Sequence, residues 1–397
     1  MNELLPKLRS NSASHTCKIR KMEQKKYRLG EIADIVNGAT PSTKKTDNYD
    51  GSIIWITPKD LSEQKMKWIR RGQRNITEKG FNSCSSQMIP PHNILMSSRA
   101  PIGLLAINEN ECCTNQGFKN LVLDKTICDT DYMYYYLKFH IKEIEALGSG
   151  TTFKEVSKSS LYNFEISLPN LETQRDISKC LSDLDRKIEL NRQINDNLEE
   201  QLRLITSRYI FGCLNLEKKR IGEIATIKAG GDCPITFSKT RTQECNIPIF
   251  SNGTEDRGLY GFTNKANIEG HSITIAARGT IGHCERRLMP FVPIIRLLAI
   301  TPKEDGAYIY LHQVIKGMKF KKNGSVQQQL TVPEISFIEI PYPHSSVLSE
   351  YNKVASPIVE MIEHNISENE FLAKQRDELL PLLMNGQASV NYHLSDD

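Results

Sequence analysis

Two stretches of the chain have the hydrophobic spacing of long helices. In the first, positions 181, 184, 188, 191, 195, 198, 202 and 205 carry Leu, Leu, Ile, Asn, Asn, Leu, Leu and Ile. At a constant offset of 174, positions 355, 358, 362, 365, 369, 372, 376 and 379 carry Ala, Ile, Ile, Asn, Asn, Leu, Arg and Leu. Steps of three and four predict a coiled-coil seam. We therefore expect two long helices, each of about 40 residues or roughly 60 Å at 1.5 Å per residue.

Two asparagines occupy the middle of each predicted seam. An asparagine at a core position lowers stability but fixes register, because its amide needs a buried partner. In one helix alone, the two asparagines could simply lie on a solvated face. Because the same pair recurs at the same offset in the second helix, a role in register is favoured. If the seams pair antiparallel, Asn191 and Asn195 lie opposite Asn369 and Asn365. The helix pair would then have a pseudo-twofold axis and hold two globules apart.

The rest of the chain consists of two β-rich globules that repeat each other. Short β-branched runs are bounded by Gly, Pro and Asn, which indicates strands and turns. Residues 27–35 return at 219–227, residues 98–103 at 277–282, and residues 150–169 at 324–343. The offset shrinks along the chain, so the second copy has shorter loops. A repeat of this length decides the fold before any single motif does.

These patterns predict an α+β fold. It has two mixed, mostly β domains, separated by two long antiparallel coiled-coil helices in a pseudo-twofold internal repeat. The predicted segments are a basic N-terminal extension (1–25), a first globule (26–170), a first spacer helix (171–213), a second globule (217–343), a second spacer helix (344–390) and a tail (391–397).

Composition excludes several classes of protein. None of the apolar runs in the 397 residues approaches the roughly 18 residues that a membrane span needs, and no signal peptide precedes the first globule. We therefore expect a cytoplasmic protein. The ten cysteines include no C-x₂-C pair, which favours reduced thiols and predicts no metal site. Residues 1–28 hold eight Lys and Arg against two Glu, a composition that suits either contact with a polyanion or a solvated tail.

Motifs for catalysis are missing. The sequence has no G-x₄-G-K-[ST] phosphate loop, no [ND]-P-P-[YF] turn of amino-methyltransferases, and neither G-x-S-x-G nor H-E-x-x-H. We therefore assign no catalytic residue and expect a chain that does not act as an enzyme alone. A self-sufficient methyltransferase remains an alternative that turnover by the purified chain would reveal.

Polar loop residues at matching places in the two repeats are the candidate contacts to DNA. Arg pairs with guanine, Asn and Gln pair with adenine, and Lys, Ser and Thr bind phosphates. Each could also be an ordinary surface residue. The candidates in the first globule are Thr40, Ser42, Thr43, Lys44, Lys45, Lys59, Ser98, Arg99, Asn115, Gln116, Lys119, Thr151, Thr152 and Lys154. Those in the second are Ser251, Asn252, Arg257, Arg278, Thr280, Lys321, Lys322, Ser325, Gln327 and Gln328.

Several motifs resemble the specificity subunit of type I restriction–modification systems over residues 26 to 390. The resemblance is stronger in the first globule and the helices than in the second globule. The motifs are Tyr-Arg-Leu-Gly-Glu-Ile-Ala (27–33), Gly-Ala-Thr-Pro-Ser (38–42), Trp-Ile-Thr-Pro-Lys-Asp-Leu (55–61), Ile-Thr-Glu-Lys-Gly (76–80), Thr-Asn-Gln-Gly-Phe (114–118) and Gln-Arg-Asp-Ile-Ser (174–178).

The resemblance implies a non-catalytic subunit that reads double-stranded DNA. Each globule would read one half of an asymmetric bipartite site, while the helices set the spacing and dock two modification subunits. S-adenosylmethionine, ATP and Mg would be bound by the modification subunits and by two restriction subunits, and this chain would hold no cofactor. An alternative from another class is a coiled-coil adaptor whose globules bind protein or another ligand.

Overall fold

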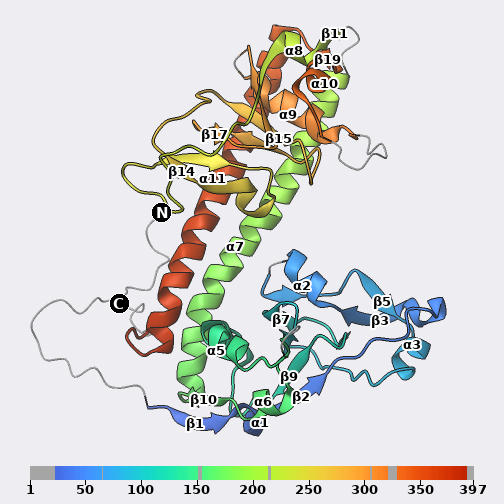
Figure 1. Ribbon diagram of the computed structural model, residues 1–397, viewed down its shortest axis with the longest axis vertical. Helices are drawn as coiled ribbons and strands as arrows, with labels where there is room; N and C mark the ends of the chain where they lie inside the picture. Colours follow the sequence, from blue (N-terminus) through green and yellow to red (C-terminus); the bar gives the residue numbers. More distant parts are fainter. Residues whose placement is uncertain are drawn as a thin grey trace, which may run out of the picture. The chain divides into compact units, whose positions relative to one another are not determined.

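The computed structural model describes residues 23–64, 66–150, 154–212, 216–304, 306–320 and 329–390 (Figure 1). The chain divides into two compact units, unit 1 with residues 1–191 and 367–397, and unit 2 with residues 192–366. The boundary between the units falls inside both long helices. The sequence analysis instead predicts each helix as a segment of its own. The physical reason is that each half-helix shares a hydrophobic core with its globule.

Unit 1 contains three sheets among its described residues. A two-stranded sheet pairs β1 (Lys25–Arg28) with β10 (Glu165–Leu168). A five-stranded sheet has the order β2 (Ala33–Asn37), β9 (Lys119–Leu123), β6 (Ile94–Ser98), β7 (Ile102–Asn108), β4 (Trp68–Ile69). A three-stranded sheet has the order β5 (Arg74–Ile76), β3 (Tyr49–Ile56), β8 (Cys113–Thr114). The helices of this globule are α1 (Leu29–Ile32), α2 (Pro58–Gln64), α3 (Glu78–Asn82), α4 (Thr130–Phe139), α5 (Ile141–Ala146) and α6 (Lys158–Tyr162), with a 3-10 turn at Thr46–Asn48.

Unit 2 repeats this arrangement with one strand fewer. Its two-stranded sheet pairs β11 (Glu217–Arg220) with β19 (Glu339–Tyr342). The larger sheet has the order β12 (Ala225–Ala229), β18 (Leu297–Pro302), β15 (Ser272–Ala276), β16 (Cys284–Arg287). The smaller has the order β14 (Leu259–Thr263), β13 (Ile247–Phe250), β17 (Val292–Pro293). Its short helices are α8 (Ile221–Ile224), α9 (Ala307–Gly317) and α10 (Val332–Ser336), with a turn at Glu255–Gly258.

Matching backbone hydrogen bonds show that the two globules are structural copies. The amide of Val156 donates to the carbonyl of Ser98 at 3.0 Å, and the amide of Leu330 donates to that of Ala277 at 2.9 Å. Ala277 corresponds to Ser98 and Leu330 corresponds to Val156 by the sequence offsets of the repeat. The registers of the two-stranded sheets agree as well, since Tyr27 lies opposite Ile166 as Lys219 lies opposite Ile340.

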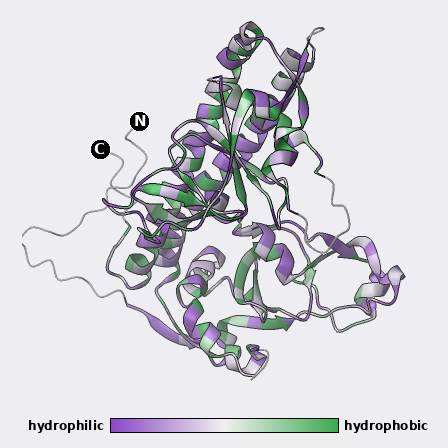
Figure 2. Cartoon of the chain, turned by 45° about the horizontal axis from the view of Figure 1, so that its top comes forward, coloured by the Kyte–Doolittle hydropathy of each residue, from purple (hydrophilic) through white to green (hydrophobic). Residues whose placement is uncertain are grey.

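Two long helices complete the units. They are α7 (Leu171–Thr206), followed by a π-helical turn (Ser207–Phe211), and α11 (Ser345–Met384). Figure 2 shows hydrophobic and hydrophilic residues interspersed along both, as expected for helices that bury one face. The first predicted seam is buried at Leu181, Leu184, Ile188, Asn191 and Leu202.

The second seam is wider than the prediction. Val359 is fully buried although the sequence placed Ile358 on the seam, and Ile358 is only partly buried. Val359 extends the buried row of Ala355 and Ile362 in steps of four and three, so it packs into the core of unit 2.

Candidate nucleic-acid interface

Three loops of unit 1 converge through backbone hydrogen bonds. The amide of Ala39 donates to the carbonyl of Thr114 at 2.9 Å, and that of Ser98 donates to the carbonyl of Gly117 at 2.7 Å. Gly38 permits this approach, because a Cβ there would collide with the backbone oxygen of Asn115. The strand ends therefore bring loops from distant parts of the sequence onto one surface.

Several predicted contacts lie together on this surface. The hydroxyl of Thr40 donates to the side-chain oxygen of Gln116. Gln116 is exposed, and Asn115 is half-buried with its side-chain oxygen accepting from the amide of Gly117 at 2.9 Å. Hydroxyl and amide groups are thus presented at the ends of β2 and β8, where they could pair with base edges.

A second group combines two cations with one carboxylate. Lys119 Nζ lies 3.0 Å from Glu155 Oε1, and Arg99 Nη1 lies 3.6 Å from Glu155 Oε2. Because one carboxylate faces two cations, the group keeps a net positive charge. The side chain of Arg99 is 37% exposed and that of Lys119 only 10%. Lys154 is exposed next to them.

The burial of two candidates corrects the sequence prediction in unit 1. Ser98 is fully buried, with its hydroxyl directed to the carbonyl of Gly117 at 3.2 Å. Lys119 is buried against Glu155. Both follow or belong to central strands whose residues pack inward, so neither presents a polar group to a ligand. Their role is to brace the loops that carry Arg99 and Gln116.

The loop after Pro41 carries four exposed candidates, Ser42, Thr43, Lys44 and Lys45. Its shape is fixed from beneath, because Asn48 Nδ2 donates to the carbonyl of Ser42 at 3.1 Å. Lys59 is also exposed, on α2, with its Nζ 3.5 Å from the Glu63 carboxylate. These cations are available to phosphates.

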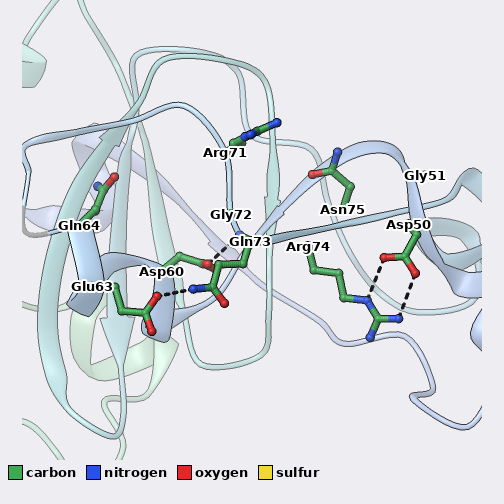
Figure 3. A pocket seen from close by; sticks show the side chains of 10 residues that line it. All are labelled: Asp50, Gly51, Asp60, Glu63, Gln64, Arg71, Gly72, Gln73, Arg74 and Asn75. Carbon is green, nitrogen blue, oxygen red and sulfur yellow. Dashed lines mark hydrogen bonds and ion pairs between the residues drawn. The ribbon is translucent and has the colours of Figure 1, made fainter. Parts of the chain in front are cut away.

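A pocket beside α2 contains polar residues that are not among the predicted DNA contacts. Figure 3 shows Gln73 between Glu63 and Asp60, and Arg74 directed to Asp50. The Asp60 carboxylate accepts from the amides of Thr57 at 2.7 Å and Gln73 at 2.8 Å, which closes the pocket floor. The signal in the sequence was the basic run 70–74. Carboxylates also line the pocket, so it does not suit a phosphate. The lining residues are Asp50, Gly51, Asp60, Glu63, Gln64, Arg71, Gly72, Gln73, Arg74 and Asn75.

In unit 2 the loop after β13 meets the arginine turn after β15. Asn252 Nδ2 donates to the carbonyl of Arg278 at 2.9 Å, and the Thr280 hydroxyl donates to the carbonyl of Asn252 at 3.0 Å. Ser251 lies directly before Asn252 and is half-buried, with its hydroxyl directed to the carbonyl of Gly258. The structure therefore brings the predicted contacts at 251–252 and at 278–280 next to each other.

The two arginine turns share positive φ angles at two matching positions. In unit 1, Ala100 and Gly103 have φ of +47° and +90°, and in unit 2, Gly279 and Gly282 have φ of +73° and +89°. The turns differ at the peptide bond in between, since Ala100–Pro101 is cis in unit 1. Arg99 and Arg278 nevertheless precede turns at matching positions in the two globules.

Arg257 is a structural residue, which corrects its prediction as a DNA contact. Its Nε lies 2.8 Å from Glu285, its Nη1 lies 2.7 Å from Glu363, and its Nη2 donates to the carbonyl of Arg286 at 2.8 Å. Burial alone would raise the pKa of Glu285, but a hydrogen bond from His283 and the charge of Arg257 hold it at about 2. The guanidinium makes four hydrogen bonds, all inside unit 2.

A second buried ion network lies beside Arg257. Arg286 pairs with Glu199 of α7 and contacts the His312 ring at 3.1 Å, and Lys316 lies 2.9 Å from Glu199. Burial would raise the pKa of Glu199, but Arg286 and Lys316 lower it to about 2. β16 and α9 are thereby joined to α7.

Some predicted sites lie outside the described residues. These are the basic segment before residue 23, the tail after residue 390, and Thr151, Thr152, Lys321, Lys322, Ser325, Gln327 and Gln328. In the part of the chain that the structure describes, no three His, Cys, Asp or Glu are grouped as metal ligands. No helix within the described ranges has both the length and the apolar character to cross a membrane.

Comparison with known proteins agrees with the repeat. The model of the type I restriction modification DNA specificity domain matches residues 22–200 and 214–374, well over half of the chain. The chain belongs to this family. It is a specificity subunit that recognises DNA sequence, and it is not a catalyst by itself.

Individual relatives cover different shares of the chain. The specificity subunit of the type I restriction enzyme MjaIX from Methanocaldococcus jannaschii is 28% identical over 91% of this chain and 93% of its own length. The EcoR124I/EcoR124II specificity subunit of Escherichia coli is 26% identical over 46% of this chain and 45% of its own. The crystal structure of the S subunit of a type I restriction-modification system from M. genitalium has a TM-score of 0.60 at 19% identity, covering 92% of this chain and 96% of that one. The last likeness supports the fold.

Proposed function

We propose that each unit of this specificity subunit reads one half of an asymmetric bipartite DNA site. The observation that carries the proposal is the pair of equivalent loop surfaces with different side chains. Unit 1 presents Gln116 and Asn115 beside Arg99, whereas unit 2 presents Asn252 and Thr280 beside Arg278. One scaffold with two sets of base-reading groups suits two different half-sites.

The proposal extends to the partner subunits. Two modification subunits dock on α7 and α11, carrying S-adenosylmethionine to the adenines of the site, and two restriction subunits add ATP- and Mg-dependent cleavage. Support comes from large apolar side chains that the helices leave exposed, since such residues mark protein interfaces. They include Leu190 and Ile194 on α7, and Met361 and Phe371 on α11. With chromosomal DNA as its target, the complex acts in the cytoplasm.

The decisive experiment is methylation mapping. The chain is co-expressed with the modification subunit of its own system in a methylation-free host, and the modified adenines are sequenced. A gapped motif with two unlike halves is expected. A single continuous motif would contradict the division of labour between the units.

A salt titration separates DNA reading from the adaptor alternative. The affinity of the chain with its modification subunits for the mapped duplex should fall steeply as salt rises, because phosphate contacts release counterions. Binding that is absent or indifferent to salt would favour the adaptor.

An insertion tests whether the helices set the gap between the half-sites. Seven residues inserted after Asn197 keep the heptad phase and lengthen α7 by about 10 Å. The gap should grow by up to about three base pairs of 3.4 Å each while both half-sites stay unchanged. The same insertion between Asn191 and Asn195 separates the asparagines and should damage folding more. An altered half-site at constant gap would refute the ruler.

A further inference from the structure

Unit 2 carries two exposed isoleucines, Ile235 and Ile295, and at one of them an apolar residue replaces a polar residue of unit 1. Gly230 closely approaches the carbonyl of Ile294 as Gly38 approaches that of Asn115, so the two glycines and their partners are equivalent. Counting onward from each partner, Ile295 stands where unit 1 has Gln116. Ile235 lies five residues after Gly230, in a segment that pairs with β14 at Ser238.

Further hydrogen bonds support this correspondence. The amide of Ala277 donates to the carbonyl of Arg296 at 2.8 Å, just as the amide of Ser98 donates to that of Gly117 at 2.7 Å. Ile295 directly precedes Arg296, whose carbonyl is bound by Ala277. Ala277 in turn directly precedes Arg278. The position belongs to the same loop surface as the candidate contacts Arg278 and Asn252.

Both isoleucines face solvent. Ile235 is 105% exposed, as much as in an extended chain, and Ile295 is 54% exposed. A fully exposed isoleucine gains nothing for folding, since its side chain leaves no water. An isolated exposed apolar residue needs no explanation. Here two lie in segments that the Gly231–Ile294 bridge joins, and one replaces a polar candidate contact, which indicates a ligand with apolar groups.

The segment that carries Ile235 is held at both ends. We call residues 232–236 the finger. Before it, Gly231 pairs with Ile294; after it, Ser238 exchanges two backbone hydrogen bonds of 2.9 and 2.8 Å with Phe262. Phe237 covers Gly261, where a Cβ would collide with its ring. Pro234 restricts the backbone just before Ile235. The apolar tip therefore projects from a firmly anchored base.

Exposed cations that lie close to the two isoleucines in sequence match a DNA ligand. Arg296 follows Ile295 and is exposed, and Lys239 follows the finger with its Nζ 4.3 Å from the Tyr260 ring centroid. Arg241 is exposed two residues further on. Apolar side chains flanked by cations suit the DNA major groove, where the thymine 5-methyl group is the apolar feature of the base edges.

We propose that Ile235 and Ile295 make unit 2 read thymine through its methyl group. This rests on the proposed half-site reading and names the chemistry that unit 2 reads. Insertion of an isoleucine between base pairs is the competing geometry. Unstacking costs about as much free energy as burial of one isoleucine returns, so methyl contact is favoured.

The experiment uses the chain assembled with its modification subunits and a duplex that carries the mapped motif. Each thymine of one half-site is replaced in turn by deoxyuridine, which lacks only the methyl group. Wild type should lose affinity about threefold to tenfold at one or two thymines, the value of burying a methyl group. Ile235→Ala or Ile295→Ala should bind more weakly and lose the sensitivity to deoxyuridine at its own thymine.

Controls distinguish the possible failures. Phe337→Ala removes an apolar side chain that is 64% exposed outside the reading surface, and it should keep the full deoxyuridine response. Thermal unfolding of both isoleucine variants should match wild type, since the removed atoms lie in water. Ile295→Gln installs the unit 1 residue and should shift the preferred base at that position.

Each outcome decides the question. If wild type does not bind a bipartite duplex at all, half-site reading itself fails. If it binds but no thymine responds, or unit 2's half-site contains no thymine, methyl reading is wrong while half-site reading stands. If the alanine variants weaken binding without a deoxyuridine effect, and 2-aminopurine in the site brightens on binding, the isoleucines unstack bases instead.

Discussion

The side-chain amide of Asn191 on α7 donates a 2.9 Å hydrogen bond to the side-chain oxygen of Asn369 on α11. A second bond of 2.8 Å runs in the reverse direction, from Asn365 to Asn195. The first lies in unit 1 and the second in unit 2. As residue numbers rise on α7 they fall on α11, so the helices are antiparallel, in the register expected from the sequence. In Figure 1 they lie side by side within each unit.

We expect Asn191→Leu to destabilise unit 1 by about 1–3 kcal/mol, because Asn369 then loses its buried partner. The double variant Asn191→Leu/Asn369→Leu should recover this loss or exceed wild-type stability, while pairing of the helices becomes less specific. Denaturant unfolding of the single and double variants measures both effects. A double variant as unstable as the single one would show that these amides do not act as a pair.

Arg257→Met should destabilise unit 2 by about 3 kcal/mol, because Glu285 and Glu363 would be left as largely buried charges without their shared partner. Hydrogen exchange in β16 and α11 reports the loss. The matched control is Arg203→Ala, which removes an exposed ion pair with Glu200 and should leave stability nearly unchanged. Equal effects of the two variants would contradict the structural role of Arg257.

Arg278→Ala and Arg99→Ala should each weaken DNA binding by about 1–3 kcal/mol, if each guanidinium contacts a base or a phosphate in two places. Competition binding with the mapped duplex, in the presence of the modification subunits, measures the change. Arg220→Ala is the control, because Arg220 lies on β11 and not in the candidate loops. Unchanged affinity in a folded variant would assign that arginine a structural role alone.

His312 should make unit 2 sensitive to mild acid. Burial, with the neighbouring charge of Arg286, lowers the pKa of His312 from 6.5 to about 3. The unfolded chain therefore takes up a proton below pH 6.5 that the folded chain refuses, so stability falls as pH falls. Between pH 7 and 5 the loss is about 2 kcal/mol.

His312→Gln should remove most of this slope, as followed by hydrogen exchange in α9 at several pH values. His364→Gln, at an exposed position on α11, should leave it unchanged. Below about pH 4.5, protonation of the unfolded chain at Glu199 and Glu285 adds a further loss, since their pKa values of about 2 are depressed in the folded state. An unaltered slope in His312→Gln would place the sensitive group elsewhere.

The sequence by itself determined the repeat, the two long helices and their asparagine register. These features depend on local periodicity, and the recurrence of Asn191 and Asn195 at one offset is visible without coordinates. The family also follows from motifs that are contiguous in the chain. The loops that meet in unit 1 were identifiable as polar, because residue types such as Asn115 and Gln116 are read directly.

Only the tertiary structure decided which polar residues face a ligand. Arg257 and Arg278 are both loop arginines in sequence, yet Arg257 meets Glu285 and Glu363, which lie 28 and 106 residues away. Lys119 similarly meets Glu155 across 36 residues. Ile235 was invisible for the opposite reason, since an isoleucine in a chain of 39% hydrophobic residues is expected inside. Burial depends on contacts between distant segments, and a linear pattern cannot supply them.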